Sequence, residues 1–145
     1  MNNKKIFIVH GHDTILHNDV ELLLRRLKFE PIILCDEASN GKTIIEKIED
    51  CSDVAFAIVL YTACDKGRVK GASSLSNCAR QNVVFEHGIF CAKLERNNVV
   101  ALHEESVEIL GDLSGVVYIS LNNDWKKELK MEMKSTGLEA DWINE

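Results

Sequence analysis

Short, continuous apolar runs alternate along this chain with longer segments of helical periodicity, and this alternation constrains the fold most strongly. Residues 6–9 form an unbroken run of β-branched and aromatic side chains, which is typical of a strand buried on both faces. Residues 14–28 then place apolar side chains three and four positions apart, as an amphipathic helix does. The same change of pattern recurs along the sequence and predicts strands and helices in turn.

Four further apolar runs predict strands, and three further segments predict helices. The strands are expected at residues 31–34, 54–61, 99–102 and 116–119, and two of the helices at residues 80–96 and 125–135. The remaining helix is expected to open at Thr43, because Thr43 and Glu46 have the spacing of a capping box. The polar stretch from residue 62 to about residue 79 is expected to be a long loop.

This order of elements predicts an α/β fold with three layers, in which helices cover both faces of a parallel sheet. Five strands joined by right-handed crossovers favour the flavodoxin-like strand order 2-1-3-4-5. A length of 145 residues suits one domain, and nothing in residues 1–145 resembles a linker. Ligands of such sheets bind beyond the carboxyl ends of the strands, which here selects residues 10–13, residues 35–42 and the loop after Tyr61.

Composition and charge exclude several classes of function. The chain has 17 Lys and Arg against 23 Asp and Glu, a net charge of -6, which argues against nucleic acid as a partner. No apolar run approaches the ~20 residues of a membrane span, and the first residues lack the core of a signal peptide. The five cysteines include no Cys-x-x-Cys pair, which favours reduced thiols in a cytoplasmic protein over disulfides or a zinc site.

Glu86 is the sharpest candidate for a functional residue. On a helical wheel it lies about 40° from Phe90 and about 60° from Val83, at the edge of an apolar stripe. A carboxylate at such an edge is partly withdrawn from water, as functional carboxylates often are. The structural alternative is a glutamate paired with Lys93 or Arg80, and the wheel favours neither interpretation. Glu46, the competing carboxylate, is already explained by the capping box.

Known motifs for metals and phosphates are incomplete in this sequence. His10 and His12 have the His-x-His spacing of two metal ligands, but the hydrolase pattern His-x-His-x-Asp-His fails after Asp13, so no metal is expected. Gly41-Lys42-Thr43 resembles the end of a P-loop, yet Asp36 stands where that motif requires glycine. Gly11 stands alone after the first strand, where a dinucleotide fingerprint needs three glycines.

Several loop charges lie at the expected ligand edge. The cations there either meet phosphates or simply solubilise the loops, and the sequence leaves both options open; they are Lys42, Arg68, Lys70 and Arg80. The acidic loop residues Asp36 and Glu37 allow the same two interpretations. A phosphate-accepting receiver domain shares the expected topology but needs an aspartate at the end of the third strand. Tyr61 and Thr62 stand there instead, with Asp65 further along.

Four stretches together resemble the bacterial TIR-like domain family of predicted nucleotide-binding effectors. They are residues 5–13, 43–47, 56–60 and 80–88, and the most specific is the last, Arg-Gln-Asn-Val-Val-Phe-Glu-His-Gly. The resemblance extends over about residues 4–121 and implies the flavodoxin-like fold. Members of this family act as effector domains of anti-phage systems such as CBASS, including proteins fused to a STING domain that senses cyclic dinucleotides.

The resemblance also implies an activity and a set of site residues. Many catalytic TIR domains hydrolyse NAD⁺ at the nicotinamide–ribose bond, with NAD⁺ as substrate and no separate cofactor, and the position of their glutamate corresponds to Glu86. The implied substrate-binding residues are His10, Gly11, His12, Asp13, Lys42, Thr62, Asp65, Arg80 and Asn82. Such enzymes become active on self-assembly into an oligomer or filament, under control of a sensor domain in cis or a partner sensor.

The sequence departs from the family pattern at four places. His12 stands where arginine is common, Cys64 follows Ala63 where a Pro-Asp pair is usual, and Ala92 and Glu95 replace two glycines. The alternative function is a non-catalytic TIR module that assembles with like domains or binds a nucleotide as a signal. A receiver-type switch phosphorylated on Asp65 is a third, weaker hypothesis.

Overall fold

The computed structural model describes residues 3–11, 14–33, 46, 53–63, 65–67, 70–71, 73–79, 81–94, 96–107, 109, 116–140 and 142. Its centre is a five-stranded sheet in which every neighbouring pair of strands is parallel. The strands lie in the order β2 (Glu30–Ile33), β1 (Lys5–Val9), β3 (Phe56–Tyr61), β6 (Val99–His103) and β7 (Val117–Ser120). Numbered along the chain without the separate hairpin, this is the predicted order 2-1-3-4-5, so the expected α/β fold is confirmed.

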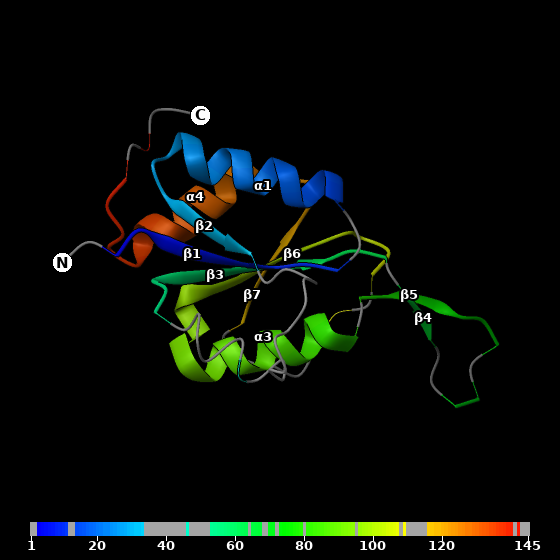
Figure 1. Ribbon diagram of the computed structural model, residues 1–145. Coiled ribbons are helices and arrows are strands. Elements are labelled where there is room, and N and C mark those ends of the chain that lie inside the picture. Colours follow the sequence, from blue (N-terminus) through cyan, green and yellow to red (C-terminus); the bar gives the residue numbers. More distant parts are fainter. Residues whose placement is uncertain are drawn as a thin grey trace.

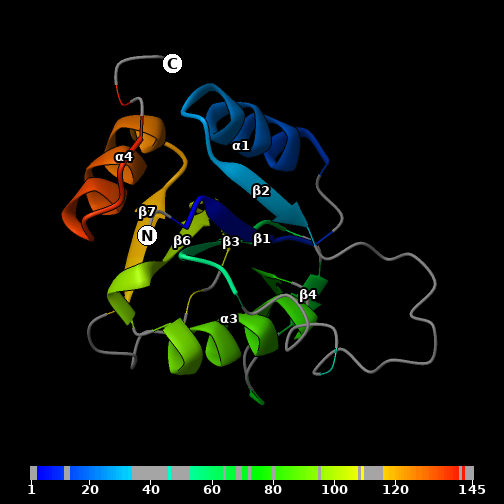
Figure 2. The same cartoon turned by 60° about the vertical axis from the view of Figure 1, so that its left-hand side comes forward.

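Helices cover both faces of this sheet, as Figures 1 and 2 show. α1 (Thr14–Arg26) and α4 (Trp125–Ser135) lie on one face, and α3 (Gln81–Leu94) lies on the other, followed by the short 3₁₀ helix η1 (Arg96–Asn98). None of the helices within the described ranges is long and apolar enough to cross a membrane. The predicted helix at Thr43 lies outside the described residues except for Glu46, which is helical and exposed.

Two separate apolar cores lie on the two faces of the sheet. Alternate residues of β3 point to opposite sides, so that Ile58 packs in the core beneath α1 and α4 while Val59 packs in the core beneath α3. Every residue of β3 is buried, as are the last four residues of β1 and the first four of β6. Burial on both faces explains why the sequence of these strands is continuously apolar.

Most predicted boundaries lie within two residues of the observed ones, and the differences have local causes. The first helix ends at Arg26 rather than residue 28. Lys28 takes a positive φ of 70°, which ends the helix before the chain turns into β2. The third strand begins at Phe56 instead of residue 54, and the helix expected at residues 80–96 spans Gln81–Leu94. The final helix has its predicted bounds.

The expected loop between residues 62 and 79 contains an antiparallel hairpin, so the prediction of a continuous loop is wrong. Its strands are β4 (Asp65–Gly67) and β5 (Ser76–Cys78), and it projects from the body of the domain on the right in Figure 1. Asn77 forms a parallel bridge with Val107, and its side-chain amide donates to the Ser106 hydroxyl at 3.0 Å. Neither three-residue strand alternates apolar and polar residues, so the sequence carries no pattern that indicates them.

The amino edge of the sheet is closed by residues from both ends of the described chain. Lys4 precedes β1 and donates to the backbone carbonyl of Glu139, while its ammonium group lies over the ring of Phe29 at 5.4 Å. Phe29 in turn packs against Trp142, with ring centroids 5.7 Å apart. Lys134 of α4 lies 5.9 Å from the Trp142 ring. The segment after α4 is thereby held against the start of β1.

Helix α4 has a capping interaction that can be tested by substitution. The Oδ1 atom of Asp124 accepts a hydrogen bond from the backbone N–H of Lys127 at 3.4 Å. Because Leu129 and Met133 of this helix are fully buried, its stability is coupled to that of the domain. We expect Asp124→Ala to lower the free energy of unfolding by about 1 kcal/mol. We expect Asp124→Asn to keep the free energy of unfolding close to the wild-type value, because asparagine also caps helices. Urea unfolding followed by circular dichroism measures both, and equal losses in the two variants would contradict the capping role.

Candidate functional site

Helix α3 holds Glu86 against the sheet, at the helical phase that the sequence predicts. Val83, Glu86 and Phe90 are on the buried side, and Glu86 is only 7% exposed. Phe90 fixes this side through its contact with Phe7 of β1, with ring centroids 4.6 Å apart. On the opposite side of the helix, Phe85 is 50% exposed. The Glu86 side chain is therefore withdrawn from bulk water on the inner side of the helix.

A pair of buried polar side chains lies beside Glu86. Tyr61 ends β3, and its hydroxyl group lies 2.7 Å from Nδ1 of His87, the residue that follows Glu86 in α3. The two rings meet edge to face, with centroids 5.4 Å apart. Tyr61 is 1% exposed and His87 is fully buried. This hydrogen bond connects the first half of α3 to the carboxyl end of the central strand.

Two more aromatic side chains extend this pair along the sheet. The ring of Tyr118 lies 6.0 Å from Tyr61 and 5.9 Å from His87, edge-on to both. His103, the residue of β6 paired with Tyr61, lies 6.2 Å from the Tyr118 ring. We call these four side chains the aromatic cluster: Tyr61, His87, His103 and Tyr118. It lies beneath α3, with Tyr61 and His103 at the ends of β3 and β6 and Tyr118 within the neighbouring strand β7.

The central pair of the aromatic cluster is uncharged at neutral pH. Burial lowers the pKa of His87 from its ordinary value of 6.5 to about 4, so the imidazole is neutral. Burial also raises the pKa of Tyr61 well above its ordinary range, with smaller contributions from Tyr118 and Cys91. Glu86 thus precedes, on the inner side of α3, a histidine that is neutral at neutral pH.

Other predicted site residues lie around the carboxyl ends of the strands. Thr62 follows β3 directly and is 2% exposed, and Asp65 begins β4 three residues later. Asn82 belongs to the first turn of α3, four positions before Glu86, and residues with this spacing share one side of a helix. The structure therefore brings the backbone of these three residues to the region where α3 begins.

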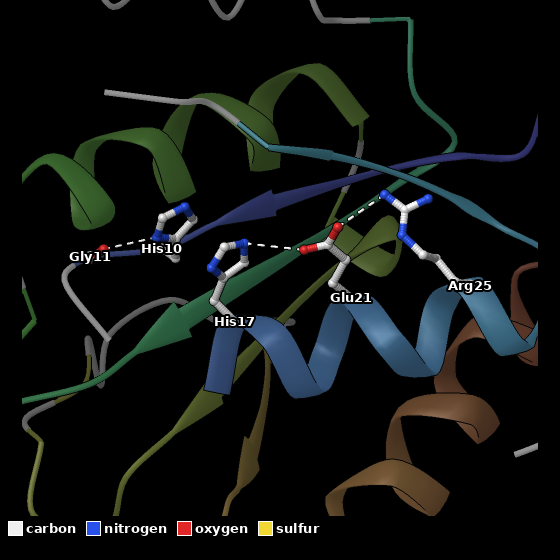
Figure 3. Close-up of polar contacts among 5 residues, drawn as sticks. All are labelled: His10, Gly11, His17, Glu21 and Arg25. Carbon is white, nitrogen blue, oxygen red and sulfur yellow. Dashed lines mark hydrogen bonds and ion pairs between the residues drawn. The ribbon is translucent and has the colours of Figure 1, made fainter. Parts of the chain in front are cut away.

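His10 and Gly11 also lie at this edge, immediately after β1, but the His10 ring points toward α1. It stacks on the ring of His17, with centroids 4.3 Å apart and planes inclined by 4° (Figure 3). His10 Nδ1 lies 2.8 Å from the Gly11 carbonyl oxygen, which can only accept, so Nδ1 is the donor in this contact. His10 and Glu86 therefore lie on opposite sides of the sheet, His10 toward α1 and Glu86 on α3.

The stacked histidines are linked to an ion pair on α1. His17 Nε2 lies 3.5 Å from one carboxylate oxygen of Glu21, and Arg25 donates to the other at 2.9 Å (Figure 3). Burial lowers the pKa of His17, the neighbouring His10 lowers it further, and Glu21 acts in the opposite direction. His17 was not among the residues predicted for the site. It lies one turn into the helix that follows His10, and this position allows the two rings to stack.

Four predicted site residues lie outside the described part of the chain: His12, Asp13, Lys42 and Arg80. The segment 35–42, expected at the ligand edge, lies outside it as well. Within the described ranges, no group of three or more His, Cys, Asp or Glu residues is arranged to hold a metal ion. Cys91 on α3 is not part of a disulfide bond.

The inner side of α3 carries a buried carboxylate, Glu86, and the next residue, His87, belongs to a buried and neutral hydrogen-bonded pair. A fixed anion in such surroundings stabilises positive charge more strongly than it would in water. Tyr61 and His87 were missed by sequence reasoning. The available indication was a histidine on the inner side of an apolar helix, four positions after Val83 and three before Phe90.

Sequence comparisons agree with this architecture. The family described as "CAP12/Pycsar effector protein, TIR domain" matches residues 5–123. YuaY of Escherichia coli K12 is 42% identical over 142 residues, which are 96% of this chain and 48% of that protein. Protein tirC of Dictyostelium discoideum is 37% identical over 140 residues, 89% of this chain and 69% of that protein. The chain thus spans about half the length of YuaY, at 48%, and about two thirds of tirC, at 69%. With a parallel sheet of the expected order and a family match over most of its length, the chain belongs to the bacterial TIR-like domains of the CAP12/Pycsar effector family.

Proposed function

We propose that this TIR domain is an NAD⁺ hydrolase, the effector of a bacterial anti-phage defence system, with Glu86 as its catalytic carboxylate. The observation that carries the proposal is the position of Glu86: 7% exposed, on the inner side of α3, in the helix that follows the third strand of the parallel sheet. Membership of the effector family supports the role in defence.

A carboxylate in this position suits cleavage of the nicotinamide–ribose bond. As the C1′–N bond breaks, its electron pair leaves with nicotinamide and positive charge develops on the ribose, as in glycoside hydrolysis. A fixed anion binds this charge more tightly than it binds the ground state, and so lowers the barrier. Water then adds to C1′ and releases a proton, which gives ADP-ribose. Nicotinamide leaves as a neutral molecule and needs no general acid.

The proposed substrate contacts come from the carboxyl edge of the sheet. Thr62, Asp65 and Asn82 lie near the start of α3, while His10 and Gly11 follow β1. His12, Asp13, Lys42 and Arg80 complete the proposed set, with the two cations meeting the diphosphate of NAD⁺. Local cations allow a protein with a net charge of -6 to bind this anionic substrate. NAD⁺ is the substrate, and the proposal includes no separate cofactor.

The direct test is incubation of the purified protein with NAD⁺ at high protein concentration. We expect release of nicotinamide and, in equal amount, ADP-ribose or a cyclised product, which chromatography distinguishes. Because we also propose activation by self-assembly under a sensor, such as a cyclic-dinucleotide-binding STING domain, the assay includes a version fused to an oligomer-forming tag. Absence of nicotinamide release from both versions would refute the hydrolase.

A second candidate function is a non-catalytic interaction module, favoured by exposed apolar residues on α1. Ile15 is 76% exposed and Leu22 is 50% exposed, and seven positions place them on the same side of the helix. Exposed apolar side chains on one side of a helix support association where they belong to a contiguous apolar patch. A protein that assembles through this side of α1 and leaves NAD⁺ intact would support the module over the enzyme.

A further inference from the structure

Packing alone does not explain why a histidine stands on the buried side of α3. His87 is fully buried on the side of α3 that also buries Val83 and Phe90. Its Nε2 atom is buried and has no hydrogen-bond partner among the described residues. A polar nitrogen in this condition destabilises the folded state, and an apolar side chain of similar size would avoid that loss.

What the histidine gains is a single directed contact with the central strand. Its Nδ1 atom lies 2.7 Å from the Tyr61 hydroxyl, at the last residue of β3. Apolar packing allows a helix to slide or rotate by small amounts, whereas a hydrogen bond specifies both distance and direction. Phe90 contacts Phe7 one turn further along α3. The two contacts together define how the helix is rotated about its axis.

This rotation decides where Glu86 points, because Glu86 and His87 are neighbours on one helical turn. Rotation of α3 outward would move Glu86 toward water, and rotation inward would press it against the sheet. A carboxylate that stabilises a developing charge must be held within a fraction of an ångström of its working position. The geometry at Glu86 therefore depends on what fixes α3 to the sheet.

We propose that His87 is a positioning residue, which sets the orientation of Glu86 by hydrogen bonding to Tyr61. The proposal rests on the proposed hydrolase function, since it concerns the same carboxylate. It assigns no contact with substrate to either residue. It also explains why a polar pair stands in the largely apolar core beneath α3, where it adds specificity of arrangement rather than stability.

The test compares kcat, KM and thermal stability in His87→Leu, Tyr61→Phe and the double variant. We expect each single variant to lower kcat about tenfold with KM changed by less than about twofold, because orientation rather than affinity is lost. The double variant is expected to be no slower than either single variant, since all three remove the same hydrogen bond. His87→Gln, whose amide oxygen accepts from Tyr61, is expected to recover most of kcat.

Stability separates positioning from a merely structural role. At neutral pH, the double variant, which leaves neither partner of the hydrogen bond unpaired, is expected to melt at or above the wild-type temperature while its kcat falls, a combination that simple destabilisation does not produce. Ile58→Val, in the core on the other side of the sheet, is the matched control and is expected to lower the melting temperature without changing kcat. Hydrogen exchange of the α3 amides is expected to increase in His87→Leu and not in the control.

Wild-type kcat in a folded His87→Leu variant would overturn the positioning role and leave the hydrolase function standing. A wild-type protein that releases no nicotinamide, even when forced to assemble, would overturn the hydrolase and the positioning role with it. Losses of kcat that add up in the double variant would show that Tyr61 and His87 act separately, and would also contradict the proposal.

Discussion

Glu86→Gln is expected to abolish NAD⁺ cleavage, with a loss of at least about 10³-fold in kcat, while the domain remains folded. The amide has the size and shape of the carboxylate but carries no charge, so it loses the attraction to the positive ribose and keeps the packing. Glu86 is only 7% exposed, so a change of its side-chain volume would disturb the packing of α3. The isosteric glutamine avoids this disturbance. Nicotinamide release measures the loss directly.

The matched control is Glu46→Gln, which makes the same chemical change at an exposed helical glutamate. Glu46 is the other carboxylate that the sequence offers as a candidate functional residue. Comparing the two variants therefore shows which of the two glutamates is needed for turnover. We expect Glu46→Gln to retain wild-type turnover and both variants to show wild-type circular dichroism. Near-normal turnover in a folded Glu86→Gln variant would remove Glu86 from the catalytic role, whatever the overall activity.

Acidification from pH 7 to pH 5 is expected to destabilise the domain through His87 by roughly 2 kcal/mol. The folded-state pKa of His87 is about 4, below its unfolded value of 6.5, because burial disfavours the charged ring. Between these values the unfolded chain binds a proton that the folded domain does not, so stability is full above pH 6.5 and falls as the pH decreases toward 4. Complete passage through this window corresponds to about 3 kcal/mol.

Urea unfolding of the wild type and of His87→Leu at pH 7 and pH 5 measures this contribution. Leucine does not titrate, so the variant is expected to lose about 2 kcal/mol less than the wild type on acidification. His17, whose pKa burial also lowers, contributes in the same direction to both proteins and cancels in the comparison. Equal losses in the two proteins would show that His87 already accepts a proton in the folded state.

The strands and the phase of α3 were predictable because burial on one or both faces leaves a pattern in the sequence. The apolar runs of β1, β3 and β6 follow from burial on both faces, and the helical wheel placed Glu86 at the edge of the buried side of α3. The orientation of His10 also follows from strand alternation. Val9 packs beneath α3, so the next residue points to the α1 face, where His17 lies.

The contacts that define the site were not predictable, since they depend on the registration of distant segments. Tyr61 and His87 are 26 positions apart, and only the crossover from β3 to α3 sets one opposite the other. The hairpin of β4 and β5 could not be predicted for a different reason. Its three-residue strands pair with each other and, through Asn77, with Val107, and backbone pairing of this kind requires no particular side chains.

The closure of the amino edge by Lys4, Phe29 and Trp142 has a practical consequence for engineering. These residues hold the positions just before β1 and well after α4 at one pole of the domain, while α3 and the hairpin begin at the other (Figure 1). A fluorescent reporter or immobilisation tag joined near residue 3 or residue 142 would therefore emerge away from the pole that carries Thr62 and the start of α3. Labelled and surface-tethered versions of the domain can be built without covering the edge of the sheet at which we propose that NAD⁺ binds.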